Sequence, residues 1–230
     1  DSYAARRKWD AALKSITLAL EDAPGVSWMW QQSGIYRKAL SDSSGAGSDF
    51  KQAIATDPAN FSARELLREL TNTPSPFSVM QTNNIDSLIR TSPSATDYPD
   101  KQSVTLLLDK QRVVYDGSRC KVRFEMLVRV LNNSGIDSYK EVTLPGGDNT
   151  IVEKAVVIKA NGREIPADRN GNYAVFKNLE PNDFIYVRIN WSESTQGELA
   201  GYFFDEFGMN DYVPSKIVRY SLLTQKSERY

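Results

Sequence analysis

The sequence predicts an α+β protein of two modules, in which α-helical hairpins precede an antiparallel β-sandwich. From Tyr3 to Leu70 apolar residues recur every three or four positions, which is typical of amphipathic helices. From Val104 onward the period falls to two, which is typical of half-buried strands. Between these regions lie Pro74 and Pro76, which cannot continue a helix. We therefore expect helices first, a break, and then strands.

The helical region contains the same pattern twice, because small, apolar and proline residues recur 34 positions apart. The matched pairs are Ala12 and Ala46, Ile16 and Phe50, Ala19 and Ala53, and Pro24 and Pro58. The fuller copy, Ser27–Asn60, also has Trp30 and Gly34 at the corresponding places, and it resembles a tetratricopeptide repeat. In such repeats small residues let two antiparallel helices approach, and a proline ends the second helix.

The match to this repeat is incomplete. Ser33 and Arg37 stand where apolar or aromatic residues are usual, and the glycines of "SDSSGAGS" are expected to form a turn that loosens the start of the second helix. The segment "FSARELLREL" supplies only the first helix of a third copy. With about two copies, the array is expected to need support from a neighbouring domain, from upstream residues or from a partner.

The resemblance implies a binding surface on the first helix of the fuller copy, formed by Trp28, Gln31, Ile35 and Lys38. An exposed tryptophan in a groove is a good anchor for a peptide. The alternative is that Trp28 packs against the preceding half-repeat.

We expect three segments: residues 1–73 as helical repeats, 74–98 as a linker, and 99–230 as the β-sandwich. The linker has room for a short helix that begins near Asn84 or Asp86 and ends before Pro93.

Two stretches show the strand period most clearly. In "KVRFEMLVRV" alternate residues from Val122 to Val130 are apolar, and the residues between them are charged except for Leu127; in "FIYVRINW" alternate residues from Ile185 to Trp191 share one face. Turns are expected at Asp116-Gly117, Asn133-Ser134-Gly135, Pro145-Gly146-Gly147, Asn161-Gly162, Asn170-Gly171 and Pro181-Asn182-Asp183. Asn161-Gly162 predicts a hairpin with a type I′ turn.

The order of these strand motifs resembles the DUF3857 family over roughly residues 97–225. The motifs are "LLD" in the first strand, the hairpin "AVVIKANGREIPA", and "YAVFKNLEPNDFIYVRINW". The resemblance implies a β-sandwich-like module of an extracytoplasmic (periplasmic or secreted) bacterial protein. It also implies a transglutaminase-like domain downstream, whose Cys-His-Asp set these residues cannot supply.

Composition excludes several classes of function. The chain has 230 residues with a net charge of −1, and it lacks the basic excess expected of a nucleic-acid-binding protein. No apolar run is long enough to span a membrane. The sequence has no histidine and one cysteine, so we expect no Ser-His-Asp or Cys-His catalytic set, no metal site and no cofactor.

Two further motifs are weighed against plain structural roles. Cys120 lies between Arg119 and Lys121, which could activate a thiol, but it shares the face of Val122, and we expect a core residue. "DRNGN" places Asp168, Asn170 and Asn172 like the start of a calcium loop. Its glycine is misplaced and the closing glutamate is missing, so we expect a turn.

The stretch "GYFFDEFGMNDYVP" is unusually aromatic, with Tyr202, Phe203, Phe204, Phe207 and Tyr212 among acidic residues. It could be a buried edge of the sandwich, a surface that packs against the next domain, or an exposed patch that binds a glycan or a protein. Its carboxylates also leave open a glycoside hydrolase, which requires two carboxylates at a defined separation.

These observations predict a non-catalytic fragment that binds a protein or peptide and positions a downstream domain. A carbohydrate-binding module that uses the aromatic stretch is the main alternative, and a carboxylate-based hydrolase is the second.

Overall fold

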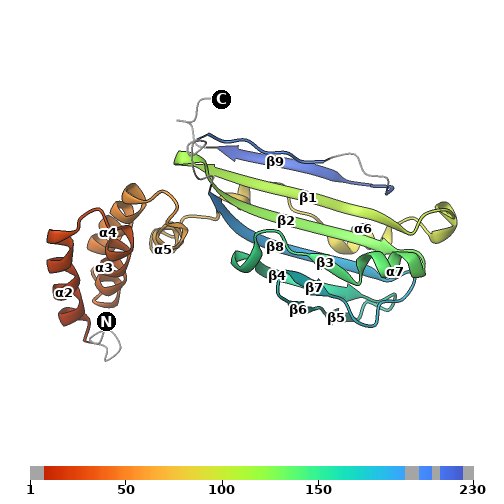
Figure 1. The fold of residues 1–230 in the computed structure, drawn as a ribbon, viewed down its shortest axis with the longest axis horizontal. Coiled ribbons are helices and arrows are strands. Elements are labelled where there is room, and N and C mark those ends of the chain that lie inside the picture. Colours follow the sequence, from red (N-terminus) through yellow and green to blue (C-terminus); the bar gives the residue numbers. More distant parts are fainter. Residues whose placement is uncertain (1–7, 195–201, 209–212, 225–230) are drawn as a thin grey trace. The chain divides into compact units, whose positions relative to one another are not determined.

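The computed structural model describes residues 8–194, 202–208 and 213–224 (Figure 1). The chain forms two compact units, Asp1–Ser78 and Val79–Tyr230. The first unit is helical and the second is built on sheets, so the α+β class with helices first is confirmed.

The helical unit repeats its architecture as well as its sequence. Its helices are α2 (Trp9–Asp22), α3 (Ser27–Ala39), α4 (Ser43–Thr56) and α5 (Phe61–Leu70). The first residues of α2 and α4, and those of α3 and α5, are each 34 positions apart, and so are the last residues of α2 and α4. The period in the sequence is therefore also the period of the helices.

Close packing of α3 on α4 explains three of the repeated residues. Phe50 is fully buried against Gly34, where an added Cβ would lie 2.5 Å from a Phe50 ring carbon. Ala46 and Ala53 on the same helix as Phe50 are also fully buried. Small residues at these places let the two helix backbones approach.

The expected loosening of "SDSSGAGS" is not found, because α4 already begins at Ser43. Asp42 caps the helix by accepting a hydrogen bond from the Gly45 backbone N–H at 2.8 Å. A side chain at position 45 would lie only 2.2 Å from the Asp42 carboxylate, so the glycine makes room for the cap. The local cap outweighs the low helix propensity of glycine.

The second unit contains a large sheet with the strand order β5-β4-β8-β2-β1-β9. Its strands are β1 (Ser103–Tyr115), β2 (Arg119–Val130), β4 (Ile151–Ile158), β5 (Glu164–Pro166), β8 (Phe184–Ser194) and β9 (Val218–Thr224). All neighbouring pairs are antiparallel except β1 and β9, which are parallel. The sheet is therefore mixed, whereas the sequence had predicted a wholly antiparallel arrangement.

A second sheet of order β3-β7-β6 accompanies the large one. Its strands are β3 (Glu141–Thr143), β6 (Asp168–Asn170) and β7 (Tyr173–Val175). Ala174 of β7 and Leu144 beside β3 join the main core with Val122, Ile185 and Trp191 of the large sheet. The faces predicted for β2 and β8 are therefore the ones that pack into this core.

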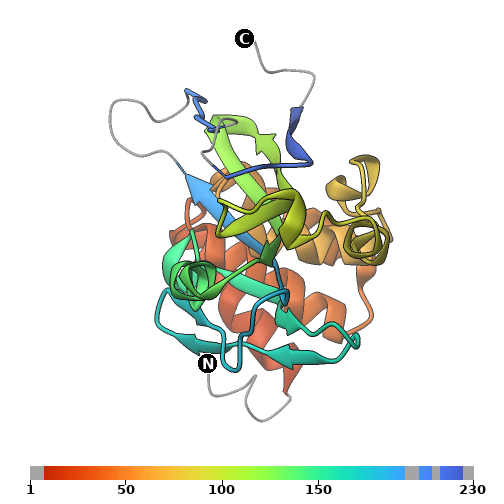
Figure 2. The same cartoon turned by 90° about the vertical axis from the view of Figure 1, so that its right-hand side faces the viewer.

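The opposite face of the large sheet is also covered, so the prediction of half-buried strands was too simple. Leu127 and Tyr186 are buried there in a second cluster. Ile85 and Leu88 of α6 (Ile85–Arg90) pack against this cluster. Figure 2 shows strands between the short helix α7 and the segment that contains α6.

The segment expected to be a linker thus contains the predicted short helix. Asn84 caps α6 by accepting from the Ser87 N–H, and α6 ends at Arg90, before Pro93. Short 3-10 turns at Pro76–Val79 and Ala95–Asp97 flank it. Residues 79–98 belong to the compact second unit.

Two turns differ in detail from the sequence prediction. The hairpin at Asn161-Gly162 is present between β4 and β5, but only Gly162 has a positive φ, so the turn is not type I′. Asn133-Ser134-Gly135 begins a short helix, α7 (Asn133–Tyr139), instead of a turn. Asn132 caps this helix by accepting from the Gly135 N–H, which the sequence analysis did not consider.

Candidate functional site

The predicted surface on α3 carries an exposed tryptophan. Trp28 is 56% exposed, so of the two sequence hypotheses the structure favours the accessible side chain. Gln31 donates a hydrogen bond to Ser62 at 3.2 Å, and Lys38 lies 3.9 Å from the Glu69 carboxylate. Because both pairs join α3 to α5 with the same sequence offset, the two helices run side by side in the same direction.

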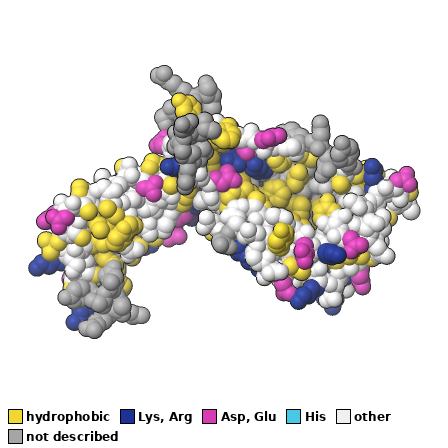
Figure 3. All heavy atoms as spheres, viewed as in Figure 1, with side chains coloured by type: hydrophobic (Ala, Val, Ile, Leu, Met, Phe, Trp, Pro, Cys, Tyr) yellow, Lys and Arg dark blue, Asp and Glu magenta, His cyan; other side chains and the backbone are white. Residues whose placement is uncertain are grey.

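Ile35 plays a different part from the other three residues. It is half-buried and packs against the cluster of Ala12, Ile16 and Tyr36, which joins α2 to α3. Ile35 therefore belongs to the packing between α2 and α3 more than to the exposed surface. Figure 3 shows hydrophobic side chains gathered over α2 and α3.

A buried polar cluster lies behind this surface at the two positions where the repeat pattern is broken. The Asp49 carboxylate accepts from Ser33 Oγ at 2.6 Å and from Arg37 Nε at 2.9 Å. Arg37 also donates to Asp42 at 2.9 Å. The hydrogen bond to Asp42 is the main reason that the pKa of Arg37 is raised. Ser33 and Arg37 thus both donate hydrogen bonds to the Asp49 carboxylate, and these bonds join α3 to α4.

The aromatic segment, residues 202–208, lies on the core-side face of the large sheet. Phe203 packs against the main core, and the Arg112 guanidinium lies 5.6 Å from the centre of its ring. Phe207 stacks at a tilt on Tyr220 of β9, with ring centres 5.6 Å apart. These two rings fix the segment to the sheet.

Asp205 holds the middle of the aromatic segment. Its carboxylate lies 3.0 Å from Lys110 Nζ and 3.0 Å from Arg112 Nε. Arg112 also pairs with Glu193 at 2.6 Å, and its side chain is 6% exposed. Burial by itself would raise the pKa of Asp205, but the neighbouring Tyr220 hydroxyl, Lys110 and Arg112 together lower it. Asp205 is therefore a charged anchor at neutral pH.

The remaining aromatic residues of the segment point outward. Tyr202 is 69% exposed and Phe204 is 65% exposed, whereas Phe203 and Phe207 between and after them are half-buried. Phe203 and Phe207 thus lie against the sheet, as expected of a buried edge, whereas Tyr202 and Phe204 are accessible to solvent. Tyr212 lies outside the described residues.

A cavity of about 520 Å³ lies between this segment and the sheet. Its lining residues are Lys110, Arg112, Ser118, Cys120, Glu193, Ser194, Phe203, Phe204, Asp205 and Glu206. Sequence reasoning found only the aromatic wall. The other wall comes from β1, β2 and β8, whose charged residues are adjacent only in the folded sheet.

Cys120 lies in the wall of this cavity but has the features of a core residue. Its side chain is almost completely buried, and the thiol lies 3.7 Å from the Ser118 carbonyl oxygen. Burial raises the pKa of the thiol, and the nearby Arg112 only partly opposes this rise. The Cys120 thiol is therefore mostly protonated at neutral pH.

A second buried polar cluster, which the sequence analysis missed, lies on the opposite face of the sheet. The Asp109 carboxylate accepts from Asn83 at 2.9 Å, from Gln111 at 3.1 Å and from Arg219 at 2.6 Å. Asn83 also donates to Glu125 at 2.5 Å. The only sign of this cluster in the sequence was the set of polar residues that alternate with apolar ones along β1 and β2. This cluster fastens residues 79–84 to three strands.

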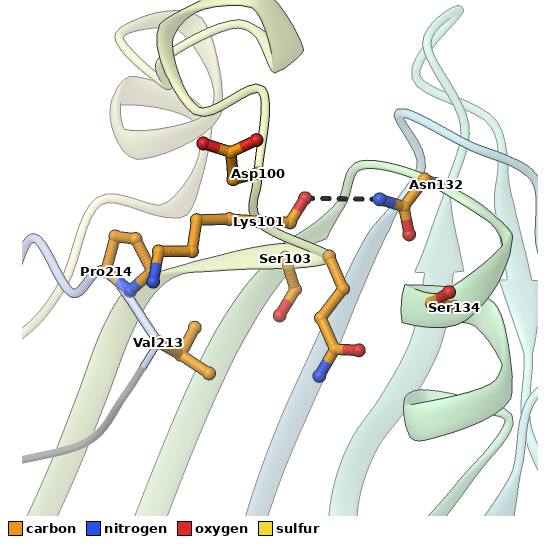
Figure 4. A pocket seen from close by; sticks show the side chains of 8 residues that line it. Asp100, Lys101, Ser103, Asn132, Ser134, Val213 and Pro214 are labelled. Atoms are coloured by element: carbon orange, nitrogen blue, oxygen red, sulfur yellow. Dashed lines mark hydrogen bonds between the residues drawn. The ribbon is translucent and has the colours of Figure 1, made fainter.

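A smaller hollow of about 360 Å³ lies where the chain enters β1 (Figure 4). It is lined by Asp100, Lys101, Gln102, Ser103, Asn132, Ser134, Val213 and Pro214. Asn132 donates from Nδ2 to the Lys101 carbonyl oxygen at 3.2 Å, which joins two of its walls. The buried Ser103 hydroxyl has no hydrogen-bond partner within the described part of the chain.

The calcium-like motif is part of a small hairpin. Asp168 and Asn170 lie in β6, Gly171 turns with a positive φ, and Asp168 pairs with Lys177. In residues 8–194, 202–208 and 213–224, no group of three His, Cys, Asp or Glu residues is arranged to hold a metal ion.

Comparisons with known proteins give little guidance. No family model matches the chain, and no curated protein matches it. A structure named a "putative protease" of Parabacteroides distasonis is similar with 12% identity and a TM-score of 0.36. The match covers 41% of this chain and 24% of that one, and so weak a similarity supports no conclusion about fold or function.

Of the helices the structure describes, none has the length and hydropathy to cross a membrane.

Proposed function

We propose that this chain is a non-catalytic module that binds a peptide segment of a protein partner through the α3 surface. The observation that carries the proposal is the exposed Trp28 on a helix that runs beside α5. The 34-residue period of the helices supports it, because repeats of this kind use the first helix of each copy to line a binding groove. Aromatic residues are the most frequent anchors of such interfaces.

The chemistry of the surface indicates the kind of peptide. Trp28 offers an apolar face, and Lys38 offers an ammonium group that is only weakly paired with Glu69 at 3.9 Å. Ten residues of helix separate them, or about 15 Å. An extended peptide of about five residues spans that length. We therefore expect a ligand with an apolar residue at one end and a carboxylate about four or five residues away.

The resemblance of the second unit to the DUF3857 family supports a wider role. In that role the fragment belongs to a larger extracytoplasmic bacterial protein, and it positions a downstream transglutaminase-like domain. The partner is then a separate protein or another segment of the same protein.

Two features support a non-catalytic role for the fragment itself. The sequence has no histidine to act as a base, and its one thiol is buried with a raised pKa. A glycosidase mechanism needs a carboxylic acid that stays protonated near neutral pH, whereas the pKa of Asp205 is lowered. The hydrolase hypothesis thus receives less support than binding.

The test is peptide selection followed by affinity measurement. Peptides selected by display on the intact chain should share an apolar residue and a carboxylate at the expected spacing. Their affinity, measured by titration calorimetry, should fall about tenfold or more in Trp28→Ala. Leu18→Ala is the matched control, since Leu18 is 54% exposed on the neighbouring helix α2.

Equal affinities for wild type and Trp28→Ala would show that the α3 surface is not the binding site. Peptide hydrolysis or acyl transfer by the purified fragment would contradict the non-catalytic part of the proposal.

A further inference from the structure

The cavity beneath the aromatic segment has the composition of a ligand site, and the α3 surface does not account for it. Its volume of about 520 Å³ falls in the range of small-molecule sites. Such sites combine apolar or aromatic walls with a few polar groups that converge on the ligand. Here the rings of Phe203 and Phe204 form one wall, and charged side chains of the sheet form the other.

Ser118 contributes an unsatisfied hydroxyl group to the cavity. Ser118 is 2% exposed, and its hydroxyl has no hydrogen-bond partner in the described residues. A buried hydroxyl without a partner costs stability, and a ligand that bonds to it removes that cost. Ser118 sits in the turn between β1 and β2 with a positive φ, so the fold holds it at the cavity in an uncommon backbone conformation.

The charges of the cavity exclude a strongly charged ligand. Lys110 and Arg112 are neutralised by Asp205 and Glu193 at distances of 2.6 to 3.0 Å, and Glu206 adds a further carboxylate. A phosphate or sulfate would meet these carboxylates, and a cation would meet the two basic groups. A neutral ligand whose groups both donate and accept hydrogen bonds fits this mixed lining best.

The aromatic side chains narrow the choice further. Phe204 lines the cavity, and Tyr202, two residues before it, is exposed as well. Tyr202 and Phe204 are exposed on either side of the half-buried Phe203, and in an extended chain residues two apart lie on one side and about 7 Å apart. The face of an aromatic ring is electron-rich and attracts the polarised C–H groups on the flat face of a pyranose ring.

We propose that this cavity and the two exposed rings form a binding site for a neutral saccharide. The hydroxyl groups of a sugar bond to Ser118, to free lone pairs of Glu193 and Glu206, and to donors of Arg112. A sugar ring stacks on Phe204, and a second ring in the same glycan reaches Tyr202. The ion pairs of Asp205 and the packing of Phe203 keep the platform in place before the ligand arrives.

The test uses the intact chain with cellobiose and N,N′-diacetylchitobiose as probes, followed by calorimetry and NMR titration. At least one probe should bind saturably. Phe204→Ala and Tyr202→Ala should each weaken that binding about tenfold or more, as expected for a lost stacking ring. Tyr173→Ala is the control, because Tyr173 is an exposed aromatic residue of the small sheet. Thermal melts should show all variants folded.

Three results would overturn the proposal: no saturable binding of either disaccharide, binding by Phe204→Ala equal to wild type, or stronger binding of a sulfated disaccharide or an acidic peptide than of both neutral sugars. Trp28→Ala should bind the saccharide normally, so failure of the peptide proposal does not affect this test.

Discussion

Replacing Asp205 with asparagine should release the aromatic segment from the sheet. The change keeps the shape of the side chain but removes its charge. It also places an amide donor against Lys110 and Arg112, which are donors themselves. Phe203 and Phe207 remain as apolar contacts. The segment should therefore open more often without unfolding of the sheet.

The expected size of the effect follows from the burial of the groups. Removing one partner of a buried ion pair costs roughly 3–5 kcal/mol. The Lys110 and Asp205 side chains are each 14% exposed, and Arg112 keeps its pair with Glu193 at 2.6 Å. Because water reaches these groups and Arg112 keeps its pair with Glu193, we expect Asp205→Asn to reduce the free energy that holds the segment closed by about 2–3 kcal/mol. That corresponds to an opening equilibrium about 30- to 150-fold larger.

Limited proteolysis measures this opening. Chymotrypsin cleaves after aromatic residues, and cleavage after Phe207 requires its ring to leave Tyr220. The rate of that cleavage, resolved by mass spectrometry, should rise by the same factor if reclosing is faster than cleavage. Asp137→Asn removes an exposed i,i+3 pair with Lys140 and should cost less than about 1 kcal/mol. If Asp205→Asn were cleaved no faster than this control, Asp205 would not be the anchor.

Three further predictions concern stability and reactivity. Gly34→Ala should lower the free energy of unfolding of the helical unit by about 1–2 kcal/mol in urea titrations, because over-packing against Phe50 exceeds the gain in helix propensity. Gly25→Ala meets no atom within 4 Å and should be neutral within about 0.5 kcal/mol. Because the pKa of Asp205 is lowered from 3.8, its stabilising charge is present above that pH and is lost as the pH falls through the folded-state pKa, so cleavage of the wild type by pepsin, which is active in acid, should accelerate below about pH 4 relative to cleavage of Asp205→Asn. Ellman's reagent should label Cys120 slowly in the native protein and faster as urea unfolds it; rapid native labelling would contradict its burial.

Features that depend on local sequence were predictable. The helices have caps and periodic apolar residues, and their 34-residue period is visible in single positions such as Ala46 and Phe50. The alternation in β2 identified its core face, and the same argument placed Cys120 in the core. Each of these inferences uses neighbours within a few residues or one repeat, where spacing translates directly into a shared face.

Features that depend on distant partners were not predictable in the same way. The parallel pairing of β1 with β9 joins residues about 110 positions apart, such as Asp109 and Arg219. The alternation of apolar and polar residues along a strand does not reveal whether its neighbour is parallel or antiparallel. The cavity likewise combines Arg112, Glu193 and Asp205 from three separate segments. Their charges could be seen in the sequence, but their meeting point depends on the register of the sheet.

Both candidate surfaces rest on polar groups placed where an apolar core would be as stable or more so. Arg37 of α3 pairs with Asp49 of α4, and Asp205 of the aromatic segment pairs with Arg112 of β1. Buried ion pairs generally add little stability compared with well-packed apolar residues. Unlike apolar contacts, however, they are satisfied only in one relative orientation, because each hydrogen bond requires a narrow range of distance and angle. We infer that the ion pairs of Asp205 serve to hold the adjacent Phe204 in a fixed direction, which lowers the entropy lost when a ligand binds to it.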